Sequence, residues 1–280
     1  MGTLVGTHGF DVKMDGVRVV AEYDGTDLRL TNRNGIDVTH RVPELSAYVP
    51  WRGPITLDGE VVAADGSFES TAIRDKQTKP ADVAAAMHRM PVKFVAFDIL
   101  HLGTDVLMSL PYLERRRLLD MAPMDGPWDR TVFSLSPTLY DAVKSLGMEG
   151  VIAKSLNAPY QQGKRSPAWI KFKITHRVSC VPIGYEPGTG ARAHFGAMYL
   201  AMLDDSGTPV PVGRVGTGFN HAEIDMLKAR LDANDLFVVE IECLNRTKTG
   251  QLRFPVYKGI RTDLSVLDAR INQIDALPAC

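Results

Sequence analysis

Lys13-Met14-Asp15-Gly16-Val17-Arg18 (KMDGVR) is the stretch around which the rest of the chain can be understood. A lysine, a glycine that lets backbone come close, and an arginine follow one another where an apolar run begins. Lys13 is a candidate nucleophilic amine, and Arg18 is a cation suited to an anionic or ribose-bearing ligand. By itself the stretch could also be an exposed turn before a strand, so its meaning depends on the motifs that follow it.

Composition and charge describe an ordinary globular chain. The 280 residues favour two domains of unequal size, and 45% hydrophobic and 23% charged residues are typical of an ordered protein. We find neither an apolar run of membrane-spanning length nor a signal peptide, so no membrane partner is expected. Three widely separated cysteines (Cys180, Cys243 and Cys280) argue against a zinc ribbon or a disulfide framework and fit a reducing cytosol. The net charge of −1 neither supports nor excludes binding to nucleic acid.

The first part of the chain contains strand and helix signals. Residues 17–23 and 28–31 flank an Asp-Gly turn and predict a β-hairpin. Residues 55–63 predict a strand in which Glu60 needs a partner if it is buried, which makes it a site candidate; an edge strand with Glu60 in solvent is the alternative. A further strand is expected at 92–100, and helices at 80–90, 111–121 and 136–147. The run Arg115-Arg116-Arg117 in the second of these helices is expected to be a solvated face.

Two later strands carry cations. Glu149-Gly150 opens a strand that contains Lys154. Residues 169–174 (WIKFKI) alternate in hydrophobicity, which places Lys171 and Lys173 on one face of a strand. Two lysines on one face repel each other unless an anion such as a phosphate lies between them; a plain solvent-facing edge strand is the alternative.

From about Thr175 the chain changes to short strands with glycine-rich turns. Strands are expected at 178–185, 197–203, 210–215 and 237–244, and a helix at 221–231 capped by Asn220. About five short strands with one helix in about a hundred residues suggest a small closed barrel, of which the OB-fold is the commonest design for nucleic acids. We therefore expect a first domain at residues 1–175 and an all-β OB-fold domain with one helix at residues 176–280.

With these pieces in order, the chain resembles ATP-dependent DNA ligases of the covalent nucleotidyltransferase superfamily over nearly its whole length. The stretches that carry the resemblance to the catalytic domain are, in chain order, KMDGVR, Arg33-Asn34-Gly35, Leu57-Asp58-Gly59-Glu60, Phe94-Val95-Ala96-Phe97-Asp98, Glu149-Gly150 with Lys154, and Trp169-Ile170-Lys171-Phe172-Lys173. The C-terminal stretches VGRVGTGF (212–219) and RFPVYKGIR (253–261) are similar to bacterial ligases of the end-joining type. The resemblance implies an α+β nucleotidyltransferase (adenylation) domain with antiparallel sheets, followed by the OB-fold barrel.

The resemblance also implies a monomeric, cytoplasmic ATP-dependent DNA ligase of a bacterial or phage-infected cell, which seals 5′-phosphate/3′-hydroxyl nicks in duplex DNA during replication, repair or recombination. Lys13 would take AMP from ATP as lysyl-AMP and pass it to the 5′-phosphate, and the 3′-hydroxyl would then displace it. Lys171 and Lys173 would be the catalytic cations, because cations favour a neutral amine and stabilise phosphoryl transfer. Glu60 and Glu149 would hold Mg²⁺ or Mn²⁺, partly through water.

A nucleotide-binding set follows from the same resemblance: Asp11, Arg18, Arg33, Glu60, Phe97, Lys154, Arg261 and Asp263. Phe97 would stack on the adenine, unless it is a plain core aromatic. Arg18 and Arg33 would hold the ribose and the nicked strand's phosphate. Arg261 and Asp263 would come from the OB-fold domain to orient the β- and γ-phosphates when the domains close.

The sequence departs from the family's pattern in three places. Two other classes of function are also alternatives to a DNA ligase. Leu264 occupies a position where the family usually has lysine, and Asp11 one where many relatives have glutamate. Few residues precede Lys13 and no separate N-terminal DNA-binding domain is seen, so a minimal two-domain ligase is expected. RNA ligases and mRNA-capping guanylyltransferases use the same lysine chemistry, although Arg18 and the barrel favour a DNA ligase. A non-catalytic OB-type nucleic-acid-binding protein would give no reason for Glu60 to accompany Lys13.

Overall fold

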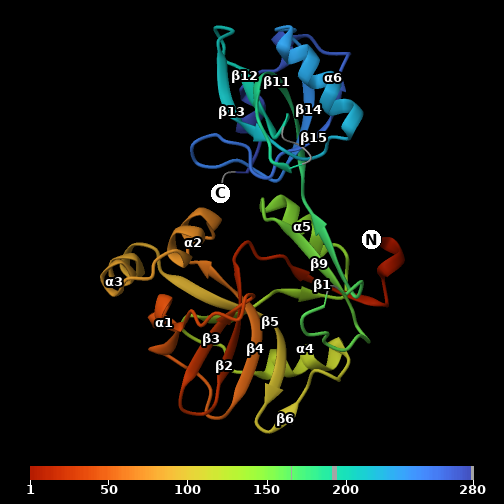
Figure 1. The fold of residues 1–280 in the computed structure, drawn as a ribbon. Helices are drawn as coiled ribbons and strands as arrows, with labels where there is room; N and C mark the ends of the chain where they lie inside the picture. The colour runs from red at the N-terminus through yellow and green to blue at the C-terminus, as the bar shows by residue number, and fades with distance from the viewer. Residues whose placement is uncertain (165, 191–193, 279–280) are drawn as a thin grey trace. The chain divides into compact units, whose positions relative to one another are not determined.

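The computed structural model describes residues 1–164, 166–190 and 194–278, and it divides the chain into two compact units, Met1–Lys173 and Ile174–Cys280 (Figure 1). Each unit has its own sheet structure and its own apolar core. Among the described residues, no helix is long and apolar enough to cross a membrane. Cys180 and Cys243 are buried free thiols, and Cys280 lies outside the described residues.

A six-stranded sheet forms the larger part of the first unit. Its strands are β2 (Val17–Tyr23), β3 (Leu28–Asn32), β4 (Ile55–Ala63), β5 (Val92–Leu102), β6 (Asp105–Val106) and β7 (Trp128–Arg130). They follow the order β3-β2-β4-β5-β6, and β7 pairs with β5 in parallel while the other pairs are antiparallel. Because β4 is hydrogen-bonded on both sides, Glu60 does not lie on an edge strand.

A second sheet has four antiparallel strands, one of which ends directly before Lys13. Its order is β10 (Trp169–Lys173), β9 (Gly150–Ser155), β1 (His8–Val12) and β8 (Phe133–Ser134). Lys13 follows β1 directly and Gly16 directly precedes β2, so KMDGVR links the two sheets. β10 is an edge strand, with Lys171 and Lys173 exposed and its other three residues half-buried.

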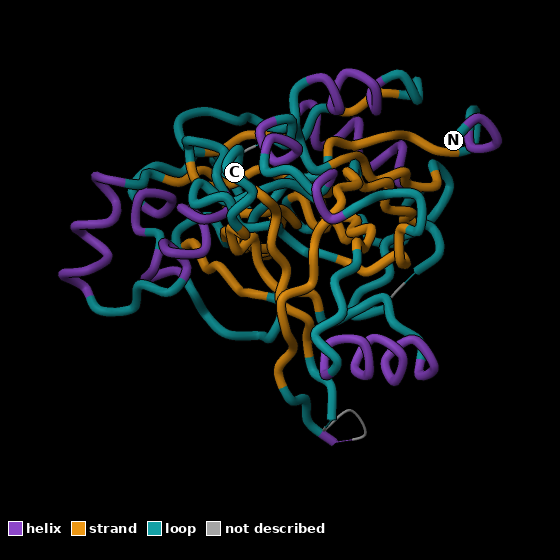
Figure 2. Tube along the Cα trace, turned by 90° about the horizontal axis from the view of Figure 1, so that it is seen from above, coloured by secondary structure: helices purple, strands orange, loops and turns teal. Residues whose placement is uncertain are grey.

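Short helices cover the sheets of the first unit. They are α1 (Pro43–Ser46), α2 (Phe68–Asp75), α3 (Pro80–Arg89), α4 (Tyr112–Met121) and α5 (Leu139–Ser145), with 3₁₀ turns at Gly2–Leu4 and Thr39–Arg41. α4 packs on β5 and α2 on β4, and α3 lies at the outer edge of the unit (Figure 1; helices are purple in Figure 2). The expectation of a solvated arginine run is wrong, because Arg115 and Arg116 are buried while Arg117 is exposed. α4 turns these two side chains inward onto buried carboxylates, Asp98 for Arg115 and Asp11 for Arg116.

The second unit is a five-stranded antiparallel sheet with one long helix. Its order is β13 (Pro209–Val215), β12 (Ala197–Leu203), β11 (His176–Glu186), β14 (Val238–Cys243) and β15 (Val256–Arg261). β11 pairs with β14 along its first half and with β12 along its second half, with a bulge at the second pairing. α6 (His221–Asp232) begins at Asn220, which forms a reciprocal capping box with Glu223 and confirms the expected cap. A 3₁₀ turn (Val266–Asp268) and α7 (Asn272–Asp275) complete the unit.

Candidate active site

Lys13 stands in a cluster with one carboxylate and a second lysine. Its backbone N–H donates to the Gly150 carbonyl at 2.8 Å, which fixes it beside the start of β9. Its Nζ forms an ion pair with Glu149 Oε2, and the other oxygen of the same carboxylate, Oε1, lies 3.6 Å from Lys173 Nζ. The Lys13 side chain is 13% exposed and that of Glu149 is 5% exposed. The ends of β1, β9 and β10 therefore bring together three of the residues expected from the sequence.

Glu60 completes this cluster from the other sheet. Its Oε2 accepts a hydrogen bond of 2.9 Å from the Gly16 amide, and Gly16 itself packs against β4 so closely that a Cβ there would lie 2.6 Å from the Val61 carbonyl oxygen. Burial raises the pKa of Glu60 to about 7, while the charge of Lys13 and the Gly16 N–H act in the opposite direction. The negative charge of Glu149 raises it further. Glu60 is thus poised between its neutral and ionised forms at neutral pH.

Arg18 is held in a fixed orientation by three hydrogen bonds to two residues. Its Nε and Nη2 donate to the two oxygens of the fully buried Asp58 at 3.0 and 2.6 Å, and Nη2 also donates to the Tyr160 hydroxyl at 3.1 Å. The guanidinium lies 5.6 Å from the ring centre of Phe97 and 5.9 Å from that of Trp169. The Asp58 carboxylate raises the pKa of Arg18, so this cation stays charged. Nothing in the sequence marks Tyr160, whereas Asp58 could have been noticed as a carboxylate in an apolar strand.

Two basic pockets meet at Arg18 and Tyr160. One, of about 530 Å³, is also lined by Lys164, Trp169 and Lys171. The other, of about 440 Å³, is also lined by Arg29, Arg33, Asn32, Gln162 and Gly163. Arg33 therefore lies in a different pocket from Lys171, and Arg18 is shared between them. Cations in two adjoining pockets suit a ligand that carries more than one phosphate.

Lys154 lies inside the protein and not in an open pocket. Its Nζ is 3.0 Å from Asp11 Oδ2 and donates to the Phe97 carbonyl at 2.8 Å. The rings of Phe97, Tyr112 and Trp169 surround it, at 4.7, 4.6 and 4.4 Å from Nζ to each ring centre. Three other side chains donate hydrogen bonds to the Asp11 carboxylate: Tyr112, Arg116 and Thr131. Lys154 and Asp11 thus form a buried ion pair, and the Lys154 ammonium contacts both the carbonyl and the ring of Phe97.

A second buried ion pair lies close to Lys154. Arg115 donates from Nε and Nη2 to the two oxygens of Asp98 at 2.8 and 3.0 Å, and both side chains are 0% exposed. Burial raises the pKa of Asp98, while the hydrogen bond from Arg115 and the charge of Lys154 lower it. Asp98 is also the cross-strand partner of Asp58, so two buried carboxylates lie side by side and each has its own arginine.

The remaining two expected residues lie in the second unit. Arg261 donates from Nε and Nη2 to the two oxygens of Asp263, at 2.8 and 2.6 Å, and its Nη1 lies 3.4 Å from Glu240 Oε1. The hydrogen bond from Arg261 lowers the pKa of Asp263 to about 2. Arg261 and Asp263 thus form an ion pair with each other. Leu264 follows directly after Asp263 in the chain.

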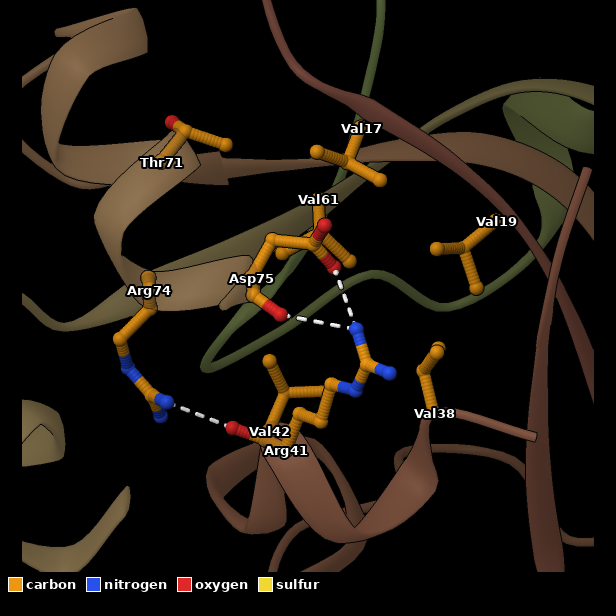
Figure 3. A pocket seen from close by; sticks show the side chains of 9 residues that line it. All are labelled: Val17, Val19, Val38, Arg41, Val42, Val61, Thr71, Arg74 and Asp75. Atoms are coloured by element: carbon orange, nitrogen blue, oxygen red, sulfur yellow. Dashed lines mark hydrogen bonds and ion pairs between the residues drawn. The ribbon is translucent and has the colours of Figure 1, made fainter. Parts of the chain in front are cut away.

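A cavity behind the catalytic strands is too small for a nucleotide. Figure 3 shows it between valines of β2 and β4 on one side and Arg41 and Arg74 on the other. Its volume of about 20 Å³ holds roughly one water. Arg74 is 1% exposed and donates to both oxygens of Glu44 at 2.8 Å. Because side chains alternate along a strand, the valines face this cavity and their neighbours Arg18 and Glu60 face the opposite side of the sheet.

Comparison with known proteins gives consistent matches. The family model described as "ATP dependent DNA ligase domain" matches residues 3–173. A DNA ligase of Natronomonas pharaonis is 32% identical over 97% of this chain and 55% of its own length. The multifunctional non-homologous end joining protein LigD of Mycolicibacterium smegmatis is 32% identical over 91% of this chain and 36% of its own length. This chain therefore spans about half, or less, of these curated relatives. The crystal structure of the ligase domain from M. tuberculosis LigD superposes with a TM-score of 0.54 at 26% identity, covering 94% of this chain and 92% of that one.

Proposed function

The chain belongs to the family of ATP-dependent DNA ligases, and from this premise we propose that it joins a 5′-phosphate to a 3′-hydroxyl at a nick in duplex DNA through a covalent AMP on Lys13. The observation that carries the proposal is the shared carboxylate: Glu149 contacts both Lys13 and Lys173. A nucleophile, a carboxylate and a second cation at one place are the groups that adenylyl transfer requires.

Lys13 performs the first step as an amine nucleophile. Its Nζ attacks the α-phosphorus of ATP, the N–P bond forms, and the bond from that phosphorus to pyrophosphate breaks. The Lys13 ammonium gives up two protons on the way, the first to the hydrogen-bonded Glu149 and the second to the departing pyrophosphate. Glu149 holds the Lys13 amine in place and is shared with Lys173. Lys171 and Lys173 lie on the exposed face of β10, where they can stabilise charge on the phosphates.

The later steps use the same site in turn. An oxygen of the 5′-phosphate attacks the phosphorus of lysyl-AMP, the N–P bond breaks, and Lys13 regains its protons. The 3′-hydroxyl then attacks the 5′-phosphorus, loses its proton and expels AMP. The pocket with Lys171 and the pocket with Arg33 adjoin at Arg18, an arrangement that suits AMP in the first and the nicked strand in the second.

The carboxylates beside Lys13 fit a divalent cation. Burial raises the pKa of Glu60 to about 7 in spite of the charge of Lys13, and a divalent cation would hold this carboxylate ionised. In the described part of the chain no group of three His, Cys, Asp or Glu side chains could hold a metal. Glu60 and Glu149 would therefore hold Mg²⁺ or Mn²⁺ together with water and phosphate oxygens. When bound, the ion would stabilise negative charge on the reacting phosphates.

For the two parts of the chain we propose an adenylation domain at residues 1–175 and an OB-fold domain at residues 176–280, acting as a monomer. The five antiparallel strands and the long helix α6 in the second unit support the OB-fold assignment. Arg261 and Asp263 would orient the β- and γ-phosphates, and their mutual ion pair would keep the guanidinium in a defined orientation.

The decisive experiment uses α-labelled ATP. After pretreatment with pyrophosphate to remove bound AMP, wild type and Lys13→Ala are mixed with label and Mg²⁺ and run on a denaturing gel. We expect label on the wild type alone, and its release when a nicked DNA duplex is added. Label with GTP in place of ATP would indicate capping chemistry, and release by nicked RNA alone an RNA ligase. Folded wild type that takes label from neither nucleotide would contradict the ligase proposal.

A further inference from the structure

Tyr160 belongs to none of the motifs that define the site, yet its hydroxyl touches both partners of the Arg18 ion pair. It donates to Asp58 Oδ2 at 2.8 Å and accepts from Arg18 Nη2 at 3.1 Å. The residue lies in the connection between β9 and β10. Its own amide donates to the Met108 carbonyl at 2.8 Å, so backbone as well as side chain fixes its place.

Two hydrogen bonds to Asp58 and one to Tyr160 occupy one side of the Arg18 guanidinium and leave its Nη1 edge open. Nε and Nη2 are used by Asp58 and Tyr160, and within the described residues Nη1 has no hydrogen-bond partner. The rings of Phe97 and Trp169 lie near the guanidinium. The Arg18 side chain is nevertheless 46% exposed, so Nη1 is available to a ligand. A guanidinium held in this way loses little conformational freedom when it binds an anion.

The position of this open edge identifies the ligand group. Arg18 and Tyr160 form the boundary between the pocket that contains Lys171 and the pocket that contains Arg33. In the proposed reaction the 5′-phosphate of the nick must reach the phosphorus of lysyl-AMP, so it has to lie where the nucleotide pocket and the strand pocket meet. Arg18 Nη1 is placed for an oxygen of that phosphate.

We propose that Tyr160 is a positioning residue, which orients Arg18 for the 5′-phosphate of the nicked strand. The inference rests on the proposed function for the identity of the ligand. Tyr160 does not touch the reacting atoms; it acts by holding Nη2 against Asp58, so that Nη1 is turned to the phosphate. A purely structural role, in which Tyr160 only packs on Trp169 at 6.2 Å between ring centres, makes different predictions.

The test measures binding, which does not depend on turnover. Enzyme freed of AMP by pyrophosphate is titrated, without ATP, into a fluorescent nicked duplex with either a 5′-phosphate or a 5′-hydroxyl at the nick. Tyr160→Phe keeps the ring and removes one hydrogen-bonding group, and we expect it to weaken binding of the 5′-phosphate nick about fivefold. Binding of the 5′-hydroxyl nick should be unchanged. Tyr23→Phe is the matched control, because among the residues that the structure describes the Tyr23 hydroxyl bonds only to the Gly25 carbonyl, within a hairpin turn.

A double variant separates positioning from structure. If Tyr160 acts through Arg18, adding Tyr160→Phe to Arg18→Ala weakens binding no further. A loss that persists in the Arg18→Ala background, or with the 5′-hydroxyl nick, overturns the inference. So does a wild type that binds both nicks equally well. Failure of the proposed function would be seen separately, as a wild type that takes no label from ATP, while the binding titration still decides the role of Tyr160.

Discussion

Replacing Glu60 by glutamine should stabilise the first unit, and only at neutral to alkaline pH. The pKa of Glu60 is raised from 4.5 to about 7, chiefly by burial. The folded state therefore binds the Glu60 proton more tightly than the unfolded chain does. The stability that this proton contributes is fully present below pH 4.5, declines as the pH rises, and is lost above pH 7. Glutamine is neutral at every pH in this range, so Glu60→Gln does not show this decrease in stability.

The size of the effect follows from the two pKa values. At about 1.4 kcal/mol per pH unit, the shift corresponds to at most about 3 kcal/mol between the ends of this range. Wild type and Glu60→Gln should thus have similar free energies of unfolding at pH 4.5, because both side chains are then uncharged. At pH 8 without divalent metal, Glu60→Gln should be the more stable by up to about 3 kcal/mol.

Tryptophan fluorescence can follow this unit selectively. All three tryptophans of the chain, Trp51, Trp128 and Trp169, lie in the first unit. Urea unfolding of both proteins at pH 4.5 and pH 8, in EDTA, gives the four free energies required. Glu22→Gln serves as the control, since Glu22 is exposed on β2 and its replacement should leave the pH dependence as it is. A stability difference between wild type and Glu60→Gln that is the same at both pH values would refute the reasoning.

Three further predictions concern buried charges and a helix cap. Lys154→Met leaves the Asp11 carboxylate without its lysine and should cost about 3–5 kcal/mol, measured by urea unfolding with tryptophan fluorescence; a loss below about 1 kcal/mol would contradict this. Arg115→Met should cost a similar amount because it isolates Asp98, and the pair Arg115→Met with Asp98→Leu should recover most of it; a double variant as unstable as the single one would count against that account. Asn220→Ala should cost about 1 kcal/mol in unfolding followed by far-UV circular dichroism, and no loss would mean that the capping box contributes nothing.

Local signals in the sequence predict much of the strand framework. Residues 17–23, 55–63 and 197–203 are strands with the expected ends, because alternation and turn residues act over a few positions. α6 begins where Asn220 predicts it, for the same reason. β1 has no comparable signal: its five residues are followed at once by Lys13, without a turn or a cap that would mark its end.

Burial of the charged side chains in α4 cannot be predicted from local patterns. The run Arg115-Arg116-Arg117 has the composition of a solvated face, and an arginine is buried only if a distant carboxylate meets it. The carboxylate that meets Arg115 lies 17 residues away in the chain, and one of those that meet Arg116 lies 105 residues away. The sheet topology determines how close these side chains lie in space, and the spacing of residues along the sequence does not reveal that topology.

Lys154 illustrates the same limit at the site itself. The sequence places it on a strand near Glu149, and the resemblance suggests a contact with nucleotide. On β9, however, its ammonium meets Asp11 from β1 and the carbonyl of Phe97 from β5. The position of Lys154 in its motif predicts the strand, and only the fold shows which groups its side chain meets.

The spacing within KMDGVR has a physical reason, because the motif crosses from one sheet to the other. β1 ends at Val12 in the four-stranded sheet, and β2 begins at Val17 in the six-stranded sheet. Gly16 makes the crossing possible: it packs against the backbone of β4, where any Cβ would collide, and its amide binds Glu60. Lys13 thereby lies at the end of a strand in one sheet, and Arg18 lies on the face of the other. An additional residue between Gly16 and Arg18 would move Arg18 to the opposite face of β2, away from Asp58. A side chain at position 16 would collide with β4, so the motif depends on both its spacing and its glycine.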